Sequence, residues 1–122
     1  MNRWAIVVVL CAAACGGVAP SPTTGLTGVV LRGPVTPVCR VDVPCEAPFS
    51  ARFTVRRSGR EVAEFQSDSA GQFTVLLEPG RYDVVPAVDA PLISPTVQVK
   101  SVTVEDTGRP TVVRLVFDTG IR

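Results

Sequence analysis

The 122-residue chain contains no histidine. Histidine is the usual general base of enzymes and the central member of most nucleophile triads, so its absence argues against both kinds of site. It also removes a common zinc ligand, and two thiols alone do not complete a tetrahedral zinc site. No glycine-rich phosphate-binding motif occurs either. These absences predict a protein that is not an enzyme and that uses no metal and no cofactor.

An excess of charge of either sign is also missing. The chain carries 12 Lys and Arg and 11 Asp and Glu side chains, for a net charge of +1. This balance offers no basic stripe, so no nucleic acid partner is expected. Four arginines cluster on one predicted hairpin, and these are Arg52, Arg56, Arg57 and Arg60. We interpret them as a solvated face, with contacts to anionic headgroups or wall polymers as the alternative.

The carboxylates form no familiar catalytic or calcium-binding pattern. Those that could in principle pair for hydrolysis are Asp42 and Glu46, Glu61 and Glu64, Asp83 and Asp89. Carboxylates on an exposed strand usually serve only solvation. Glu105-Asp106 with Asp89 could bind calcium, but no loop has the alternating oxygen spacing of known calcium loops.

The N-terminus has the pattern of an export signal. A positive segment, Met1-Asn2-Arg3, precedes an apolar run and then small residues. The uncharged run from Trp4 to Ala19 holds 16 residues, whereas a membrane-spanning helix needs about 20. We therefore expect residues 1–14 to be a signal peptide rather than a permanent transmembrane anchor.

Cys15 stands where such a signal ends. Ala12-Ala13-Ala14 before it and Gly16 after it resemble the lipobox of bacterial lipoproteins, although that family usually has Leu at the first of these positions. The resemblance implies that Cys15 becomes the mature N-terminus, is acylated with diacylglycerol and anchors the protein to the cell membrane in the envelope. Residues 15–25 would form a flexible tether. An ordinary secretory signal, which leaves a soluble secreted protein, is the alternative.

Cys39 and Cys45 lie six positions apart and flank a proline-bearing loop. Thiols of an exported chain oxidise, so the pair predicts a structural disulfide. Closing this loop would contribute about 2–2.5 kcal/mol in the chain-entropy description. A redox-active pair is the weaker hypothesis, because nothing resembles Cys-x-x-Cys.

Beyond residue 25, hydrophobic residues alternate with period two and show no helical periodicity. The strands that this pattern predicts are 26–32, 49–57, 60–67, 72–77, 81–85, 96–105 and 111–118. Within 96–105 the apolar residues change phase, which predicts a bulge or bend near Lys100-Ser101. About seven short strands at this spacing indicate an all-β fold, a small antiparallel β-sandwich.

The turn residues around 68–85 complete this picture. Asp68 and Gly71 fit the first and fourth positions of a type I turn. Pro79 presets φ and Gly80 supplies the positive φ of a type II turn. We therefore expect the strands 72–77 and 81–85 to form a hairpin. Tyr82, directly after this turn, could bury its ring and send its hydroxyl to a loop backbone.

Three segments carry a family resemblance, and these are Gly28-Val29-Val30, Asp68-Ser69-Ala70-Gly71-Gln72-Phe73 and Leu77-Glu78-Pro79-Gly80-Arg81-Tyr82. They resemble the carboxypeptidase regulatory-like domain, except that Ser67 replaces its usual Thr. The resemblance covers about residues 26–118 and implies a transthyretin-like sandwich of seven strands in a domain spanning 26–122. The family's members include accessory modules, surface repeats and single secreted domains, so the resemblance implies no particular reaction.

Together these patterns predict a non-enzymatic cell-envelope lipoprotein module that binds or supports a ligand of unknown identity. Its interaction surface would be the loops 37–48 and 86–95. Its partners would be the membrane, through the lipid anchor, and an envelope protein or polysaccharide; the oligomeric state stays open. The alternatives are a carbohydrate-binding module, which needs exposed aromatic side chains that this chain largely lacks, and a soluble secreted protein-interaction domain.

Overall fold

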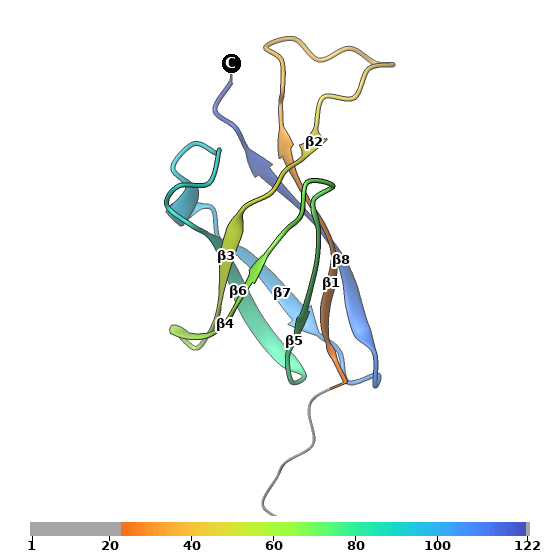
Figure 1. Ribbon diagram of the computed structural model, residues 1–122, viewed down its shortest axis with the longest axis vertical. Helices are drawn as coiled ribbons and strands as arrows, with labels where there is room; N and C mark the ends of the chain where they lie inside the picture. The colour runs from red at the N-terminus through yellow and green to blue at the C-terminus, as the bar shows by residue number, and fades with distance from the viewer. Residues whose placement is uncertain (1–22, 122) are drawn as a thin grey trace, which may run out of the picture.

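The computed structural model describes residues 23–121, which form two β-sheets packed face to face (Figure 1). The first sheet contains β1 (Gly25–Gly33), β2 (Ala47–Pro48), β5 (Gln72–Leu76) and β8 (Pro110–Asp118). The second contains β3 (Arg52–Arg57), β4 (Arg60–Gln66), β6 (Gly80–Pro86) and β7 (Lys100–Val104). A short 3-10 helix, η1 (Pro95–Val97), precedes β7. The predicted all-β sandwich is confirmed.

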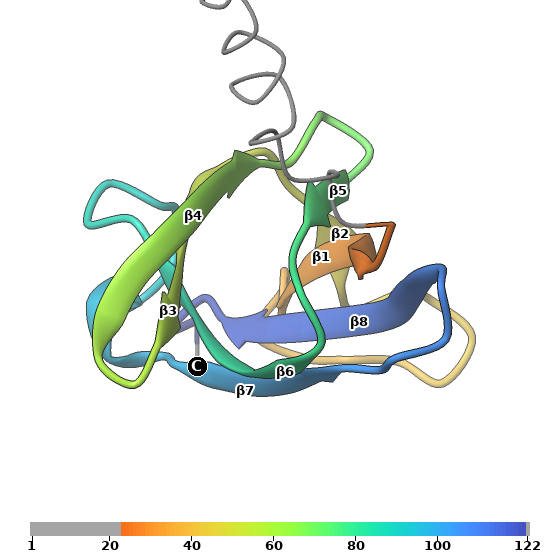
Figure 2. The same ribbon diagram turned by 90° about the horizontal axis from the view of Figure 1, so that it is seen from below.

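Strand β1 lies at the centre of the first sheet. It pairs with β2 and β5 on one side and with β8 on the other. The β8 pairing is parallel and runs the whole length of the strand, from Gly25 opposite Pro110 to Gly33 opposite Asp118. Every other pairing is antiparallel, so the expectation of antiparallel pairing is wrong at this one place. The chain passes from β7 in the second sheet to β8 in the first, as the end view shows (Figure 2).

Gly28 allows β1 and β8 to approach one another. A Cβ atom built on Gly28 would lie 1.8 Å from the carbonyl oxygen of Val113, far inside van der Waals contact. The backbone of Gly28 has φ 158°, a value that side-chain-bearing residues rarely adopt. Glycine at this position is therefore required by the parallel pairing itself.

The hairpin expected at residues 72–85 does not form. Strand β5 pairs with β1 in the first sheet, whereas β6 pairs with β3 and β7 in the second. The Pro79-Gly80 segment therefore carries the chain from one sheet to the other. The type II turn is wrong as well, because Gly80 has φ 149° rather than the about 80° of such a turn. Alternation reports which face of a strand is buried and does not report which strand is its neighbour.

The hairpin of β3 and β4 is confirmed. Ser58 and Gly59 both have positive φ, 53° and 79°, as a two-residue type I′ loop requires. The ladder begins at Arg52 rather than at Phe49, although Phe49 is buried as expected. One irregularity in the β3–β4 register lies between Val55 and Arg56.

The phase change within 96–105 has another cause than the predicted bulge. The segment starts with η1, where Val97 is exposed, and the strand itself begins only at Lys100. Val102 and Val104 of β7 are buried. The two phases thus belong to two different backbone conformations, and a continuous strand 96–105 with a bulge is wrong. The change of conformation falls just before Lys100, close to the place predicted for a bulge or bend.

The core between the sheets is built on phenylalanines. Phe73 of the first sheet stacks on Phe65 of the second, at 4.2 Å between ring centroids, and Phe65 stacks on Phe53 within the second sheet, at 5.0 Å. Phe117 then packs 5.5 Å from Phe53 and 6.2 Å from Phe49. Aliphatic side chains surround this row, and they are Leu26, Val30, Val55, Leu77, Val84, Val102, Val104 and Leu115. Because each ring buries a large apolar area, this row supplies much of the energy that holds the two sheets together.

The two ends of the sandwich carry different segments. The chain enters at one end, where Thr24 Oγ1 donates to the Leu77 carbonyl at 2.6 Å. At the opposite end lie the segments 34–46, 67–71, 87–94 and 119–121, which we call the loop end (Figure 1). Cys15, the expected signal 1–14 and most of the expected tether lie outside the described residues. Between residues 23 and 121, no helix is long and apolar enough to cross a membrane.

Ser67, directly after β4, connects to the segment that precedes β3. Its side chain is almost fully buried, and its hydroxyl donates to the Phe49 carbonyl at 2.8 Å while accepting from the Ala51 amide at 2.9 Å. The change Ser67→Ala leaves both partners unsatisfied, so we expect the free energy of unfolding to fall by about 1–3 kcal/mol. Denaturant titration measures this loss.

The matched control is Ser69→Ala, because Ser69 is exposed in the same turn. It should change the free energy of unfolding by no more than about 0.5 kcal/mol. Equal effects of the two variants would contradict the role assigned to the Ser67 hydroxyl.

Candidate functional site

The disulfide loop, residues 34–46, is the largest segment at the loop end. The predicted disulfide between Cys39 and Cys45 is present, with 5.5 Å between the two Cα atoms. A backbone hydrogen bond joins the two sides of the loop near its base, where the Val35 amide donates to the Cys45 carbonyl at 2.9 Å. The loop thus has a fixed base and a covalently closed tip.

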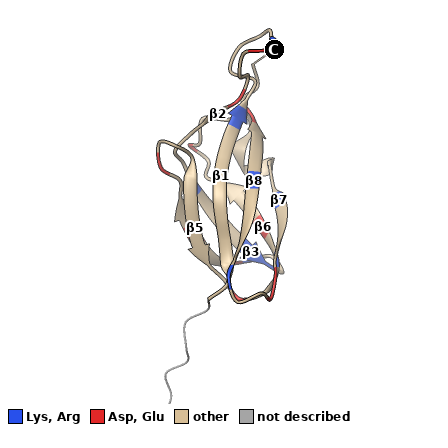
Figure 3. Ribbon diagram, turned by 90° about the vertical axis from the view of Figure 1, so that its right-hand side faces the viewer, with Lys and Arg blue, Asp and Glu red and all other residues tan. Residues whose placement is uncertain are grey.

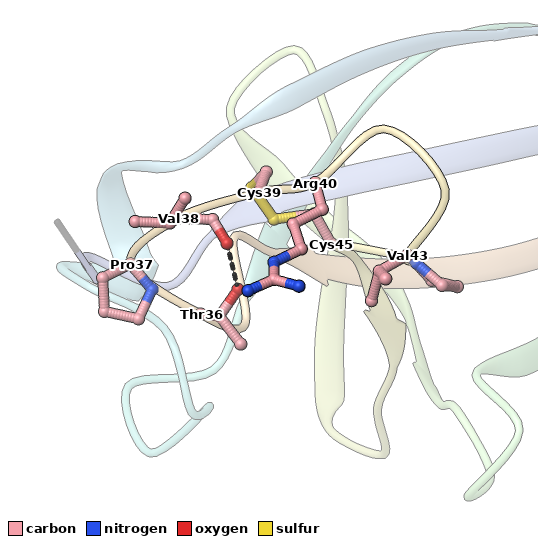
Figure 4. Close-up of a pocket in the computed structure, with 8 residues that line it drawn as sticks. Thr36, Pro37, Val38, Cys39, Arg40, Val43 and Cys45 are labelled. Carbon is pink, nitrogen blue, oxygen red and sulfur yellow. Dashed lines mark hydrogen bonds between the residues drawn. A yellow bond between two sulfur atoms is a disulfide. The ribbon is translucent and has the colours of Figure 1, made fainter.

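The tip presents apolar side chains to solvent. Val41 is fully exposed and Val38 is 74% exposed, with Val43 half exposed. A hollow of about 560 Å³ lies within the loop, walled by the disulfide, Pro37 and Pro44. Figure 4 shows the Arg40 guanidinium extending over this hollow toward Thr36. These valines add little to the hydrophobic core, because their side chains stay exposed to solvent within the described chain. Exposed valines on a covalently restrained loop are better suited to contact with an apolar surface of another molecule.

The second loop, residues 87–94, lies at the same end. Two of its side chains face inward: Ala90 is buried, and Leu92 packs against the core. Its outer side chains include Val88, 79% exposed, and Ile93, 46% exposed. The two loops predicted as interaction surfaces are therefore on one end of the molecule, and both expose apolar groups.

The C-terminal tail joins the two loops. The Thr119 amide donates to the Gly33 carbonyl at 3.1 Å, and the Thr119 hydroxyl donates to the Pro34 carbonyl at 2.7 Å. On the other side, the Ile93 amide donates to the Asp118 carbonyl at 3.1 Å. Residues 118 and 119 thus connect the base of the disulfide loop to the 87–94 loop.

Gln98 fixes the tail in this position. Its amide nitrogen donates to the carbonyls of Ile93, at 2.6 Å, and Asp118, at 2.9 Å. Its side-chain oxygen accepts from the Asp118 amide at 2.8 Å. A single side chain therefore satisfies three backbone groups of two separate segments.

Asp68 and Gly71 form the turn expected of them. One Asp68 carboxylate oxygen accepts from the amides of Ala70 and Gln72, both at 2.9 Å, and the Gly71 amide donates to the Asp68 carbonyl. Gly71 has φ 74°, and its carbonyl accepts from the Val30 amide at 2.8 Å. The turn thereby attaches the β4–β5 crossing to β1, and its residues have a structural role.

Tyr82 makes the contact expected from the sequence, with a buried ring and a hydroxyl bound to a loop backbone. This contact lies at the end of the sandwich where the chain enters. The Tyr82 ring is buried and its hydroxyl donates to the Glu78 carbonyl at 2.6 Å. The Arg57 guanidinium lies 5.3 Å from the ring centroid and also donates to the hydroxyl at 3.3 Å. Pro79 and Gly80 lie between Glu78 and Tyr82, within the segment that this hydrogen bond closes, so their role too is structural.

The carboxylates do not converge. Asp89 lies in the 87–94 loop, whereas Glu105-Asp106 follow β7 at the opposite end of the sandwich, so the calcium arrangement considered from sequence is wrong. The Glu46 carboxylate pairs with Arg114 of β8. Within residues 23–121, no three His, Cys, Asp or Glu side chains come together as a metal-binding group.

Sequence reasoning predicted neither the contacts of the tail nor the role of Gln98. The segment Asp118-Thr119-Gly120 has turn composition, and the Gly120 amide does donate to the Asp118 carboxylate at 2.8 Å. That composition could have indicated a local turn, but not the segment to which it attaches. Gln98, between two exposed valines, carries no signal in sequence, because two of its three partners belong to Asp118, twenty positions away.

The change Gln98→Ala should loosen the contact between the tail and the 87–94 loop, leaving the backbone bond from the Ile93 amide to the Asp118 carbonyl as the direct link. It removes three hydrogen bonds, one of which shields the Asp118 amide, so we expect a loss of about 1–3 kcal/mol in the free energy of unfolding. Hydrogen exchange at Ile93 and Asp118 should accelerate with it. Gln66→Ala, at an exposed strand position, is the control; unchanged exchange at Ile93 and Asp118 in the Gln98 variant would contradict the bridge.

Comparisons with known proteins bear on the fold. No family model matches the chain, and no curated protein is similar to it in sequence. The solved structure of a DUF3823 family protein from Bacteroides ovatus is similar, with a TM-score of 0.54 and 19% identical residues. The similarity covers 80% of this chain and 44% of that protein, so this chain spans less than half its length. At this identity the two proteins share a β fold, and nothing further follows about activity.

Proposed function

We propose that the chain is an exported lipoprotein, anchored at Cys15, whose β-sandwich binds a protein partner of the cell envelope through its loop end. The observation that carries the proposal is the convergence of the disulfide loop, the 87–94 loop and the C-terminal tail on one end. In this proposal the protein is not an enzyme. Its role is recognition or support.

The placement of the chain entry supports this arrangement. Thr24 enters at the end opposite the loops, and β1 spans nine residues between the two ends. At about 3.3 Å per residue, the strand separates the entry from the loop end by roughly 26–30 Å. An anchor that precedes Thr24 would leave the loop end facing away from its own membrane and open to a partner.

The restraint on the disulfide loop also supports binding. The disulfide and the Thr119 bonds hold a segment that contributes no residue to the hydrophobic core. Restraining a loop before it binds lowers the entropy that association would otherwise cost. The exposed valines, Val38 and Val41, would then be buried against the partner, at about 1.5–3 kcal/mol for each fully buried side chain.

Membership in the carboxypeptidase regulatory-like family is part of the proposal. The Asp68 turn and the Tyr82 bond to the Glu78 carbonyl explain the structural role of two of the three motifs on which that resemblance rests. The two-sheet arrangement agrees with the expected sandwich. The carbohydrate-binding alternative finds less support, because all six aromatic side chains within residues 23–121 are buried.

Metabolic labelling with a fatty-acid probe tests the anchor. The full-length chain should incorporate the probe, because the Cys15 thiol is the proposed acyl acceptor. Cys15→Ser should abolish incorporation, while Cys11→Ser serves as a matched control and should leave it intact. Incorporation that persists in the Cys15 variant would refute the lipoprotein proposal.

Site-specific photo-crosslinking in cells tests the loop end. A benzophenone amino acid at position 41 should capture one envelope protein, because Val41 is fully exposed at the tip. The same group at position 103, on the outer face of β7, should not capture it. The double variant Cys39→Ser/Cys45→Ser should reduce capture at least several-fold, since the loop loses its restraint.

Capture of the same proteins from both positions, or of none from position 41, would count against the loop end as the binding surface. Thermal melting of each variant shows that the sandwich is intact.

A further inference from the structure

The outer faces of the two sheets differ sharply in charge. The second sheet carries charged side chains along three strands, and these are Arg52, Arg56, Glu64, Arg81 and Asp83. The strands of the first sheet place two charged residues on its outer face, Arg114 and, at the end of β8, Asp118; Arg114 pairs with Glu46 at the end of the disulfide loop. Figure 3 looks onto this face, where β1, β5 and β8 are almost free of charged residues.

Apolar side chains occupy the first-sheet face instead. Val112 is 78% exposed and Leu76 is 54% exposed, and Val29, Leu31 and Val116 lie partly exposed around them. The hydroxyls of Thr27 and Thr74 bond to each other at 3.0 Å, so the polar groups of this face are satisfied within the sheet. The solvent-exposed face of a sheet normally carries polar side chains. A largely apolar face is better suited to packing against another surface.

We infer that this face binds a second copy of the chain, sheet against sheet. An isologous pair needs a self-complementary surface, and this face carries groups of both signs close together, Arg114 and Glu46. A two-fold axis can place Arg114 of each copy near Glu46 of the other. The chain beyond residue 14 has eleven basic and eleven acidic side chains, so net charge does not oppose the pairing.

The orientation of the pair follows from the strands. Aligned packing of two sheet faces keeps their strand directions within about 30° of each other. With the two-fold axis along the strands, both copies enter at the same end, where Thr24 lies. Both loop ends then point the same way. This last feature rests on the proposed anchor, since two chains held in one membrane would have to enter from the same side.

The size of the face predicts a weak, reversible pair. Strands β1 and β8 are nine residues long and β5 is five residues long. At a spacing of about 4.8 Å they give a flat area on the order of 400 Å² per copy. Specific interfaces bury about 800 Å² of accessible surface per partner, so this pair lies at the low end. Confinement to a membrane would raise the effective concentration and favour it.

Photo-crosslinking of the full-length chain in cells tests the pairing. The benzophenone amino acid at position 112 should give a crosslinked homodimer, shown by co-purification of two differently tagged copies. Position 103, on the outer face of the second sheet, is the control and should give none. Leu76→Asp should lower the yield from position 112 at least tenfold while leaving the melting temperature unchanged, because Leu76 is half exposed.

Sedimentation of the purified Cys15→Ser chain separates this inference from the anchor. Its mass should rise from monomer toward dimer with concentration, and Leu76→Asp should keep it monomeric. This result would stand even if fatty-acid labelling failed. Monomer mass at every concentration together with no homodimer from position 112 would overturn the inference. So would crosslinks from position 112 to a different protein.

Discussion

The structure depends on the double pairing of β1. This strand holds β2 and β5 on one side and β8 on the other, and its parallel contact with β8 requires the missing side chain of Gly28. A methyl group there would meet the Val113 carbonyl and force the two strands apart. Because β1 and β8 also carry Leu26, Val30, Leu115 and Phe117 into the core, separating them would open the sandwich along its length.

The same pairing organises the loop end. Parallel strands finish together, so Gly33 and Asp118 are neighbours, and the residues that follow them start from one place. Thr119 can then reach the base of the disulfide loop while Asp118 meets Ile93 and Gln98. The loop end is thus a consequence of strand direction. An antiparallel β8 would have put the C-terminus at the opposite end, where the chain enters.

The sequence indicates which face of a strand is buried, but it does not indicate which strands pair with one another. The alternating segments do bury one face, with Phe53, Val55 and Phe73 in the core, Tyr82 buries its ring as expected, and the cysteine spacing correctly indicated the disulfide. The pattern around Pro79-Gly80 is equally compatible with a hairpin and with a crossing between sheets, and the crossing occurs. Likewise no local signal shows that β8 runs parallel to β1, because that contact joins residues more than eighty positions apart.

Hydrogen exchange of the protein in its native envelope, compared with the purified protein, tests most directly whether the loop end is the recognition surface. The method reports on every backbone amide without presupposing a partner. Slower exchange in the envelope is expected in the segments 34–46 and 87–94, with the outer strands of the second sheet unchanged. Slower exchange confined to the second sheet, or none at the loop end, would contradict it.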